Sequence, residues 1–142
     1  MNRSGETPGA FFPRWFLGWI PLGLATAVVF QGAVLPPEKI PAIFLRINDK
    51  LIHGTEYFFL FLFAANAFLQ ARALWLARSP LGFAFIYCLM IGAATEIVQI
   101  FIPGRTADLL DWAADGLGAA VALGIVYGLA SLLKVSPNRI SS

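Results

Sequence analysis

The stretch EIVQIFIPGRTADLLDWAADGLGAA, residues 96–120, places a polar turn between two apolar runs. Pro-Gly-Arg at positions 103–105 is a turn signal. Polar side chains border this turn on both sides: Glu96, Gln99, Asp108, Asp111 and Asp115. A charged side chain that faces lipid is costly, so such groups in membrane segments face other helices or a wet cavity. The passage therefore predicts two membrane helices that meet through their polar ends.

The composition argues against a soluble domain and against a nucleic-acid partner. Of the 142 residues, 58% are hydrophobic and 13% are charged, whereas soluble domains carry about 25% charged residues. The net charge of +2 is small and the basic residues are scattered, so no basic surface for a phosphate backbone is expected. The single cysteine, Cys88, lies in an apolar run and is expected to be a small packing residue. The expected partner is a lipid bilayer.

Four apolar runs are long enough to cross a hydrocarbon core of about 30 Å. They occupy residues 14–35, 51–71, 80–102 and 112–133. Short connections favour an up-and-down order. The predicted fold class is therefore an all-α membrane protein, a four-transmembrane-helix antiparallel bundle. The predicted organisation is a flexible N-terminal tail at 1–13, a transmembrane domain at 14–133 and a C-terminal tail at 134–142.

The segment between the first two runs, residues 36–50, allows two interpretations. Ile40, Ile43, Phe44 and Ile47 recur at helical spacing among basic residues. This pattern is typical of a short helix lying in the membrane interface. An irregular loop is the alternative.

The basic residues indicate how the bundle sits in the membrane, because cytoplasmic loops carry an excess of Lys and Arg. One side collects Arg3, Arg14, Arg72, Arg78, Lys134 and Arg139, and the other collects Lys39, Arg46, Lys50 and Arg105. Six against four favours cytoplasmic N- and C-termini. Seven of the eight acidic residues, all except Glu6, then fall in or near the two outer connections.

Helical spacing predicts that three polar faces meet near the outer membrane surface. Residues at i, i+4 and i+7 share one face of a helix, and three such sets occur: Asp49, His53 and Glu56; Gly92, Glu96 and Gln99; Asp111, Asp115 and Gly118. With a rise of about 1.5 Å per residue, the ionisable groups of all three sets lie at a similar depth. The sequence predicts an outward-facing pocket lined by Asp49, Lys50, His53, Glu56, Tyr57, Glu96, Gln99, Arg105, Asp111 and Asp115, with Arg105 placed to pair with a carboxylate or to hold an anion.

Small residues on the last run predict a close helix contact. Ala114, Gly118 and Ala122 repeat at intervals of four, and Gly124 and Gly128 form a GxxxG pattern. Such faces let helices approach closely in lipid. Packing within the monomer and a homodimer are both compatible with this face.

Two of these stretches resemble the VanZ-like family of small bacterial membrane proteins. They are DKLIHGTEYFFL at 49–60 and EIVQIFIPGRTADLLDWAADGLGA at 96–119. This chain has Asp115 where many members carry Asn. The resemblance implies a multi-pass protein of the bacterial cytoplasmic membrane with a role in the cell envelope. The founding member is associated with low-level resistance to the glycopeptide teicoplanin, so a glycopeptide or a lipid-linked cell-wall precursor enters as a possible partner.

Three functions are compatible with the polar residues. A binding site would hold a lipid-linked precursor, a lipid headgroup or a divalent cation, with Asp49, His53, Glu96, Asp111 and Asp115 as the candidate metal ligands. An enzyme would use His53 as a general acid or base and Glu96 as a second catalytic group. A structural network would only hydrogen-bond the helices together. A proton path is disfavoured, because no Asp, Glu, Lys, Arg or His occurs between Tyr57 and Ala71 or between Gly116 and Leu133.

Overall fold

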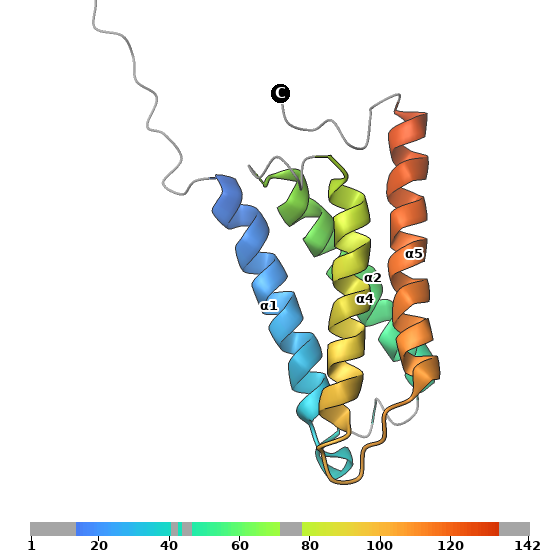
Figure 1. Ribbon diagram of the computed structural model, residues 1–142. Coiled ribbons are helices and arrows are strands. Elements are labelled where there is room, and N and C mark those ends of the chain that lie inside the picture. Colours follow the sequence, from blue (N-terminus) through green and yellow to red (C-terminus); the bar gives the residue numbers. More distant parts are fainter. Residues whose placement is uncertain (1–13, 41–42, 44–46, 72–77, 134–142) are drawn as a thin grey trace, which may run out of the picture.

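Four long helices form the described part of the molecule (Figure 1). The computed structural model describes residues 14–40, 43, 47–71 and 78–133. Its long helices are α1 (Arg14–Val34), α2 (Asp49–Leu69), α4 (Pro80–Gln99) and α5 (Leu109–Leu132). All four are long and apolar enough to cross a membrane. The predicted all-α fold with four membrane-spanning helices is confirmed.

The helices alternate in direction, as Figure 1 shows. The start of α1 and the end of α5 lie at one end of the bundle. The connections after α1 and after α4 lie together at the opposite end. This second end, called the site end below, carries the polar residues singled out in the sequence. The predicted tails at 1–13 and 134–142 and the connection at 72–77 lie outside the described residues.

Two side-chain caps set where helices begin at the site end. Asn48 precedes α2, and its side chain accepts a hydrogen bond from the Lys50 backbone N–H at 3.0 Å. Asp108 precedes α5 and accepts one from the Leu110 backbone N–H at 2.8 Å. Such caps satisfy backbone N–H groups that have no partner inside the helix. Because Asp108 is the cap, α5 begins at Leu109, three residues before the predicted start.

Helix α4 is shorter than predicted, and the turn after it begins earlier. Helix α4 ends at Gln99, three residues before the predicted end at 102. The chain then turns, with Arg105 donating its backbone N–H to the Ile102 carbonyl at 3.0 Å. Gly104 has a φ of +79°, a conformation that residues with a Cβ rarely adopt. The Pro-Gly-Arg turn signal therefore marks a true change of direction.

The segment after α1 contains one short turn, the 3₁₀-helix η1 (Pro37–Lys39). Ile40 has extended backbone geometry after this turn. Of the residues on which the interfacial helix was predicted, Phe44 lies outside the described residues. The interfacial helix between 36 and 50 stays a prediction.

The bundle interior is apolar toward the end opposite the site. Tyr57, Phe61, Leu81 and Cys88 are all buried, and the single cysteine is a free packing residue, as predicted. Large apolar side chains on the outer faces of the helices are exposed, for example Leu24, Phe59, Met90 and Leu117. Exposed apolar side chains on a membrane-spanning bundle face lipid, which suits them.

The closest packing in the bundle joins α2 to α5. Both helices have glycine at the contact, and the Cβ that an alanine at Gly118 would carry lies 2.7 Å from the Gly54 carbonyl carbon and 2.9 Å from its Cα. Real Cβ atoms do not approach backbone so closely, so the contact requires glycine at 118. By contrast, Gly124 and Gly128 have open space beside them. The first part of the predicted small-residue face therefore packs inside the monomer, and a homodimer through the second part stays a prediction.

We expect Gly118→Ala to destabilise the bundle by about 1–3 kcal/mol, because the added methyl group must push α2 away from α5. The matched control is Gly124→Ala, where the methyl group meets nothing within 4 Å. The measurement is unfolding of the full-length protein in mixed detergent micelles. Equal stability of the two variants would contradict the tight contact between α2 and α5.

Candidate functional site

A ladder of ion pairs joins α2 to α5 at the site end. The Lys50 ammonium donates hydrogen bonds to Asp108 Oδ2 at 2.6 Å and to Asp111 Oδ1. Asp111 is only 6% exposed, whereas Asp108 lies at the edge of the bundle. The hydrogen bond from Lys50 lowers the pKa of Asp108 below the usual 3.8, and the backbone N–H of Leu110 lowers it further. The Lys50 ammonium therefore reduces the repulsion between the two carboxylates, which lie close together at the start of α5.

His53, one helical turn deeper in the bundle than Lys50, makes the next contact of the ladder between α2 and α5. Its Nδ1 lies 2.9 Å from Asp115 Oδ1, and its Nε2 lies 3.8 Å from Asp111 Oδ2. Asp115 is completely buried. When Asp115 is ionised and no cation is bound, Nδ1 carries the proton and donates it to Asp115 Oδ1. The ring is thereby fixed in orientation by a buried carboxylate on the neighbouring helix.

Glu96 ties α4 to the start of α5. Its Oε2 accepts a hydrogen bond from the Asp108 backbone N–H at 2.6 Å. Its other oxygen, Oε1, is buried and has no hydrogen-bond partner among the described residues. The same is true of Asp115 Oδ2. Buried polar atoms are normally paired, so these two carboxylate oxygens are an unusual feature of the site end.

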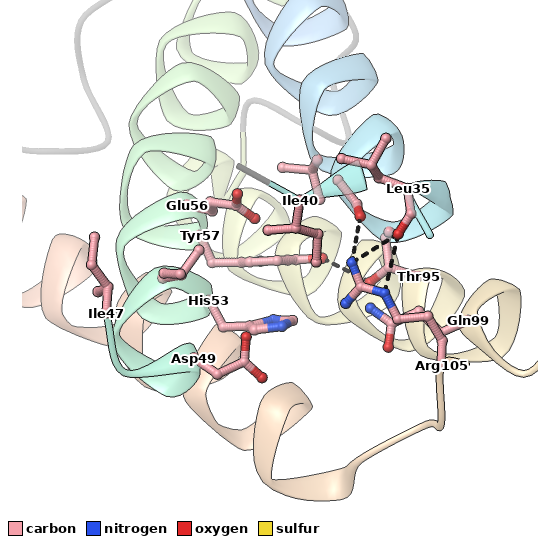
Figure 2. A pocket seen from close by; sticks show the side chains of 14 residues that line it. Leu35, Ile40, Ile47, Asp49, His53, Glu56, Tyr57, Thr95, Gln99 and Arg105 are labelled. Atoms are coloured by element: carbon pink, nitrogen blue, oxygen red, sulfur yellow. Dashed lines mark hydrogen bonds between the residues drawn. The ribbon is translucent and has the colours of Figure 1, made fainter. Parts of the chain in front are cut away.

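A cavity of about 380 Å³ opens on the other side of His53. Its polar wall comes from α2, α4 and the turn after α4, and Figure 2 shows these side chains pointing toward one another. The polar lining residues are Asp49, His53, Glu56, Tyr57, Thr95, Gln99 and Arg105. The rest of the lining is aliphatic and comes mainly from the end of α1 and the segment that follows: Val29, Ala33, Leu35, Ile40, Ile47 and, from α2, Ile52.

The residues predicted to line one pocket are divided between this cavity and the ladder. Asp49, His53, Glu56, Tyr57, Gln99 and Arg105 line the cavity. Four predicted residues do not line it. The ladder contains three of them, Lys50, Asp111 and Asp115. The fourth, Glu96, lies beside the ladder. His53 is shared, because its ring lines the cavity while Nδ1 contacts Asp115. A shallower hollow of about 280 Å³ at the mouth brings Asp49, Arg105 and Asp111 together again.

Arg105 forms no ion pair with a carboxylate of the described residues, which was one of the two roles expected from the sequence, and the other role, holding an anion, stays a prediction. Its Nε and Nη2 donate to the Leu35 carbonyl at 3.2 and 3.1 Å, and Nη2 also donates to the Gly32 carbonyl at 3.1 Å (Figure 2). These carbonyls lie at the C-terminal end of α1, where backbone acceptors have no partner inside the helix. The positive charge of Arg105 also interacts favourably with the negative end of the α1 dipole. Arg105 therefore attaches the turn after α4 to α1.

One guanidinium nitrogen of Arg105 is not used in these hydrogen bonds to α1. Its Nη1 has no hydrogen-bond partner within the described part of the chain. Glu56 is likewise without a hydrogen bond or ion pair to the residues that the structure describes. Both side chains line the cavity. The cavity thus presents one cation and one anion whose hydrogen-bonding capacity is not used by the protein.

Two residues of the candidate site were not among those predicted to form it. Asp108 bridges Lys50, Glu96 and the start of α5, and its position before an apolar run was an available helix-cap signal. Thr95 lines the cavity and lies 3.2 Å from the Tyr57 hydroxyl. Since Thr95 Oγ1 donates to the Gly92 carbonyl, the Tyr57 hydroxyl donates to Thr95. A threonine in an apolar run carries no comparable signal.

Two groups of side chains have the spacing to hold a metal ion. Asp49, His53 and Asp111 form one group, and His53, Glu96 and Asp115 form the other. In each group one ligand atom per residue lies within 4.8 Å of the others. The first group is partly exposed, whereas the second lies inside the bundle.

Comparison with known proteins decides the family. The family model for VanZ/LLP1 matches residues 14–133, which include all four helices and both motifs. The chain belongs to the VanZ/LLP1 family. The resemblance drawn from the two motifs is thereby confirmed. A search of curated proteins found no match, and a search of solved structures found none either.

The family match and the four apolar helices together make this a multi-pass membrane protein. In this VanZ/LLP1 protein the two motifs contribute different parts of one site. The first motif supplies Lys50, His53 and Glu56 from α2, and the second supplies Glu96 and Arg105 around the turn. The site therefore requires both motifs and the bundle that brings them together.

Removing Lys50 should change how stability depends on pH. Because the folded-state pKa of Asp108 is lowered, its contribution is present at pH values above the ordinary 3.8 and is lost as the pH falls through the lower folded value. We expect Lys50→Met to be less stable than the wild type at pH 7 and to lose less stability on acidification to pH 3.

Thermal denaturation in detergent across this pH range measures the difference. Lys39→Met is the control, because Lys39 is exposed and forms no ion pair with the residues described. Parallel pH profiles for Lys50→Met and the wild type would contradict the role given to Lys50.

Proposed function

We propose that this protein binds the headgroup of an amphiphilic lipid in the cavity at the site end, with residues 14–133 as the functional unit. The observation that carries this proposal is the mixed lining of the cavity, aliphatic mainly where α1 and the following segment form the wall and polar mainly where α2 and α4 form it. A soluble polar metabolite would leave the aliphatic wall without a partner. A headgroup with its first acyl or prenyl carbons contacts both walls.

The depth of the cavity supports a lipid ligand. With a rise of about 1.5 Å per residue, His53 lies about 6 Å and Tyr57 about 12 Å below Asp49, where α2 begins. If Asp49 lies near the membrane surface, the cavity extends from the headgroup region into the outer part of the hydrocarbon core. A lipid reaches this level without leaving the membrane.

The unused polar groups indicate the chemistry of the headgroup. Arg105 Nη1 favours a phosphate oxygen, and guanidinium groups bind phosphate strongly. Glu56 and Asp49 favour an ammonium or hydroxyl group beside that phosphate. A phosphatidylethanolamine headgroup has this composition, and so does a lipid-linked cell-wall precursor with its diphosphate and sugar hydroxyls. The association of the founding member with teicoplanin resistance supports a role for such binding in the cell envelope.

Glu56→Gln provides the sharpest test, because Glu56 lines the cavity but makes no hydrogen bond or ion pair with the residues described. We expect about a tenfold or greater loss of lipid affinity, since a charge-assisted hydrogen bond contributes roughly 1.5–3 kcal/mol. Native mass spectrometry of the full-length protein titrated with phosphatidylethanolamine, phosphatidylglycerol and a polyprenyl diphosphate measures this loss. Thermal stability should stay unchanged.

Glu38→Gln is the matched control, an exposed acid at the same end that does not line the cavity. Two results would contradict the proposal. One is that none of the three lipids binds the wild type more tightly than a neutral detergent does. The other is equal affinity of Glu56→Gln and the wild type for each lipid.

A lipid-modifying enzyme is the second candidate. The observation that favours it is the pair formed by His53 and Asp115, with Nδ1 held 2.9 Å from a buried carboxylate and the ring lining the cavity. A carboxylate that orients an imidazole is the arrangement a general base requires. The same mass spectra separate the two functions, because an enzyme converts the bound lipid into a product in the wild type but not in His53→Ala.

We also propose that the cavity opens to the outside of the bacterial cytoplasmic membrane, with both termini in the cytoplasm. The distribution of basic residues supports this orientation. In a Cys88→Ala background, Thr106→Cys in the turn after α4 should react with an impermeant maleimide added to intact cells. Ser79→Cys, exposed at the other end of the bundle, should react only after permeabilisation. The reverse pattern would place the cavity on the cytoplasmic side.

A further inference from the structure

We propose that a divalent cation binds inside the bundle between His53, Glu96 and Asp115. This site lies on the α5 side of the His53 ring, and neither Glu96 nor Asp115 lines the lipid cavity. The inference therefore goes beyond the proposed lipid binding and does not depend on it.

The ligand atoms are already gathered. One ring nitrogen of His53 and one oxygen from each of Glu96 and Asp115 lie within 4.8 Å of one another. His53 Nδ1 and Asp115 Oδ1 are 2.9 Å apart. Adjacent ligands of an octahedral ion with bonds near 2.1 Å lie about 3.0 Å apart. The separation is therefore suitable for two neighbouring metal ligands as well as for a hydrogen bond.

Two unpartnered oxygens point to a ligand. Glu96 Oε1 and Asp115 Oδ2 are buried without a hydrogen-bond partner in the described part of the chain, and their residues are only 7% and 0% exposed. A buried carboxylate oxygen without a donor or cation is strongly unfavourable. A cation bound among the three side chains would give both carboxylates a partner of opposite charge.

The charges around the site are not balanced by the protein. Glu96, Asp111 and Asp115 are buried at this end, and the neighbouring cations are already engaged. The Lys50 ammonium contacts Asp108 and Asp111, and the Arg105 guanidinium contacts backbone carbonyls of α1. Among the described residues, His53 is the only cationic side chain within ion-pair distance of Asp115, and none is within that distance of Glu96.

The second metal-spaced group is less suitable. It combines His53 with Asp49, which is exposed, and with Asp111, which Lys50 already neutralises. In the buried group, the Asp108 backbone N–H holds Glu96 through Oε2 and leaves Oε1 available. Hydrogen bonds that orient a metal ligand in this way are typical of metal sites.

Space for the Asp115 carboxylate depends on a glycine of α4. A Cβ at position 92 would lie 2.8 Å from Asp115 Oδ2, so Gly92 leaves room for this carboxylate. Two carboxylates and one imidazole favour Mn²⁺ or Zn²⁺, because oxygen ligands suit manganese and a mixed nitrogen and oxygen set suits zinc.

The experiment uses the full-length protein in detergent, stripped with EDTA and then dialysed against Mn²⁺, Zn²⁺, Mg²⁺ or Ca²⁺. We expect one tightly bound Mn²⁺ or Zn²⁺ per chain by elemental analysis and a higher melting temperature with that ion. Asp115→Asn and Glu96→Gln should each weaken binding by more than about tenfold. Glu38→Gln, an exposed acid of η1 outside both groups, should bind like the wild type.

Each outcome bears on the cation independently of lipid binding, because the assay contains no lipid probe. A folded wild type that binds none of the four ions and gains no stability overturns the proposal, and protons then neutralise the buried acids. Equal binding by the wild type, Asp115→Asn and Glu96→Gln places the ion elsewhere and overturns it as well. If Asp115→Asn does not fold, the measurements on the wild type and Glu96→Gln still decide the question.

Discussion

The contact between Gly54 and Gly118 sets the geometry on which the rest of the structure depends. Two helices that touch backbone to backbone have little freedom to rotate or slide. Directly beside this contact, His53, the residue before Gly54, meets Asp115, three residues before Gly118, at 2.9 Å. One further turn brings Lys50 to Asp111. The close contact thus determines which polar side chains can meet.

Burying the acidic side chains of the site end costs desolvation free energy, which the contacts within the bundle only partly offset. Lys50 and His53 pair with three aspartates, and the Asp108 backbone N–H satisfies one oxygen of Glu96. Two carboxylate oxygens remain without partners among the described residues. A structural network alone has no need of such uncompensated charge, since buried charges stabilise only when they are fully paired. As proposed above, we assign this surplus to a bound ion or ligand.

His53 connects the two halves of the site. On one side its ring lines a cavity with an aliphatic wall and a polar wall, and on the other its Nδ1 contacts a buried aspartate. A ligand in the cavity and a change of charge in the ladder would therefore affect the same imidazole. This position makes His53 the residue through which headgroup binding, acid–base chemistry and cation binding would influence one another.

Much of the fold followed from the sequence, because an apolar run of about 20 residues has few alternatives to a membrane helix. The spacing of Glu96, His53 and Asp115 also indicated that these residues share one depth. Sequence spacing does not determine how each helix rotates about its axis, so the separation of the cavity from the ladder was not predicted. The attachment of Arg105 to α1 was not predicted for a related reason, since its acceptors are backbone carbonyls at the end of α1. Residue type alone does not reveal such a partner.

His53 is the only histidine in the chain, so its imidazole nitrogens can be observed without interference. Nitrogen-15 NMR of histidine-labelled protein in lipid bilayers is the most direct test of the buried contact between His53 and Asp115. The account predicts a rigid ring with a hydrogen-bonded or metal-bound Nδ1, and a large change of that signal in Asp115→Asn. A mobile ring with the spectrum of free imidazole, unchanged in Asp115→Asn, would contradict it.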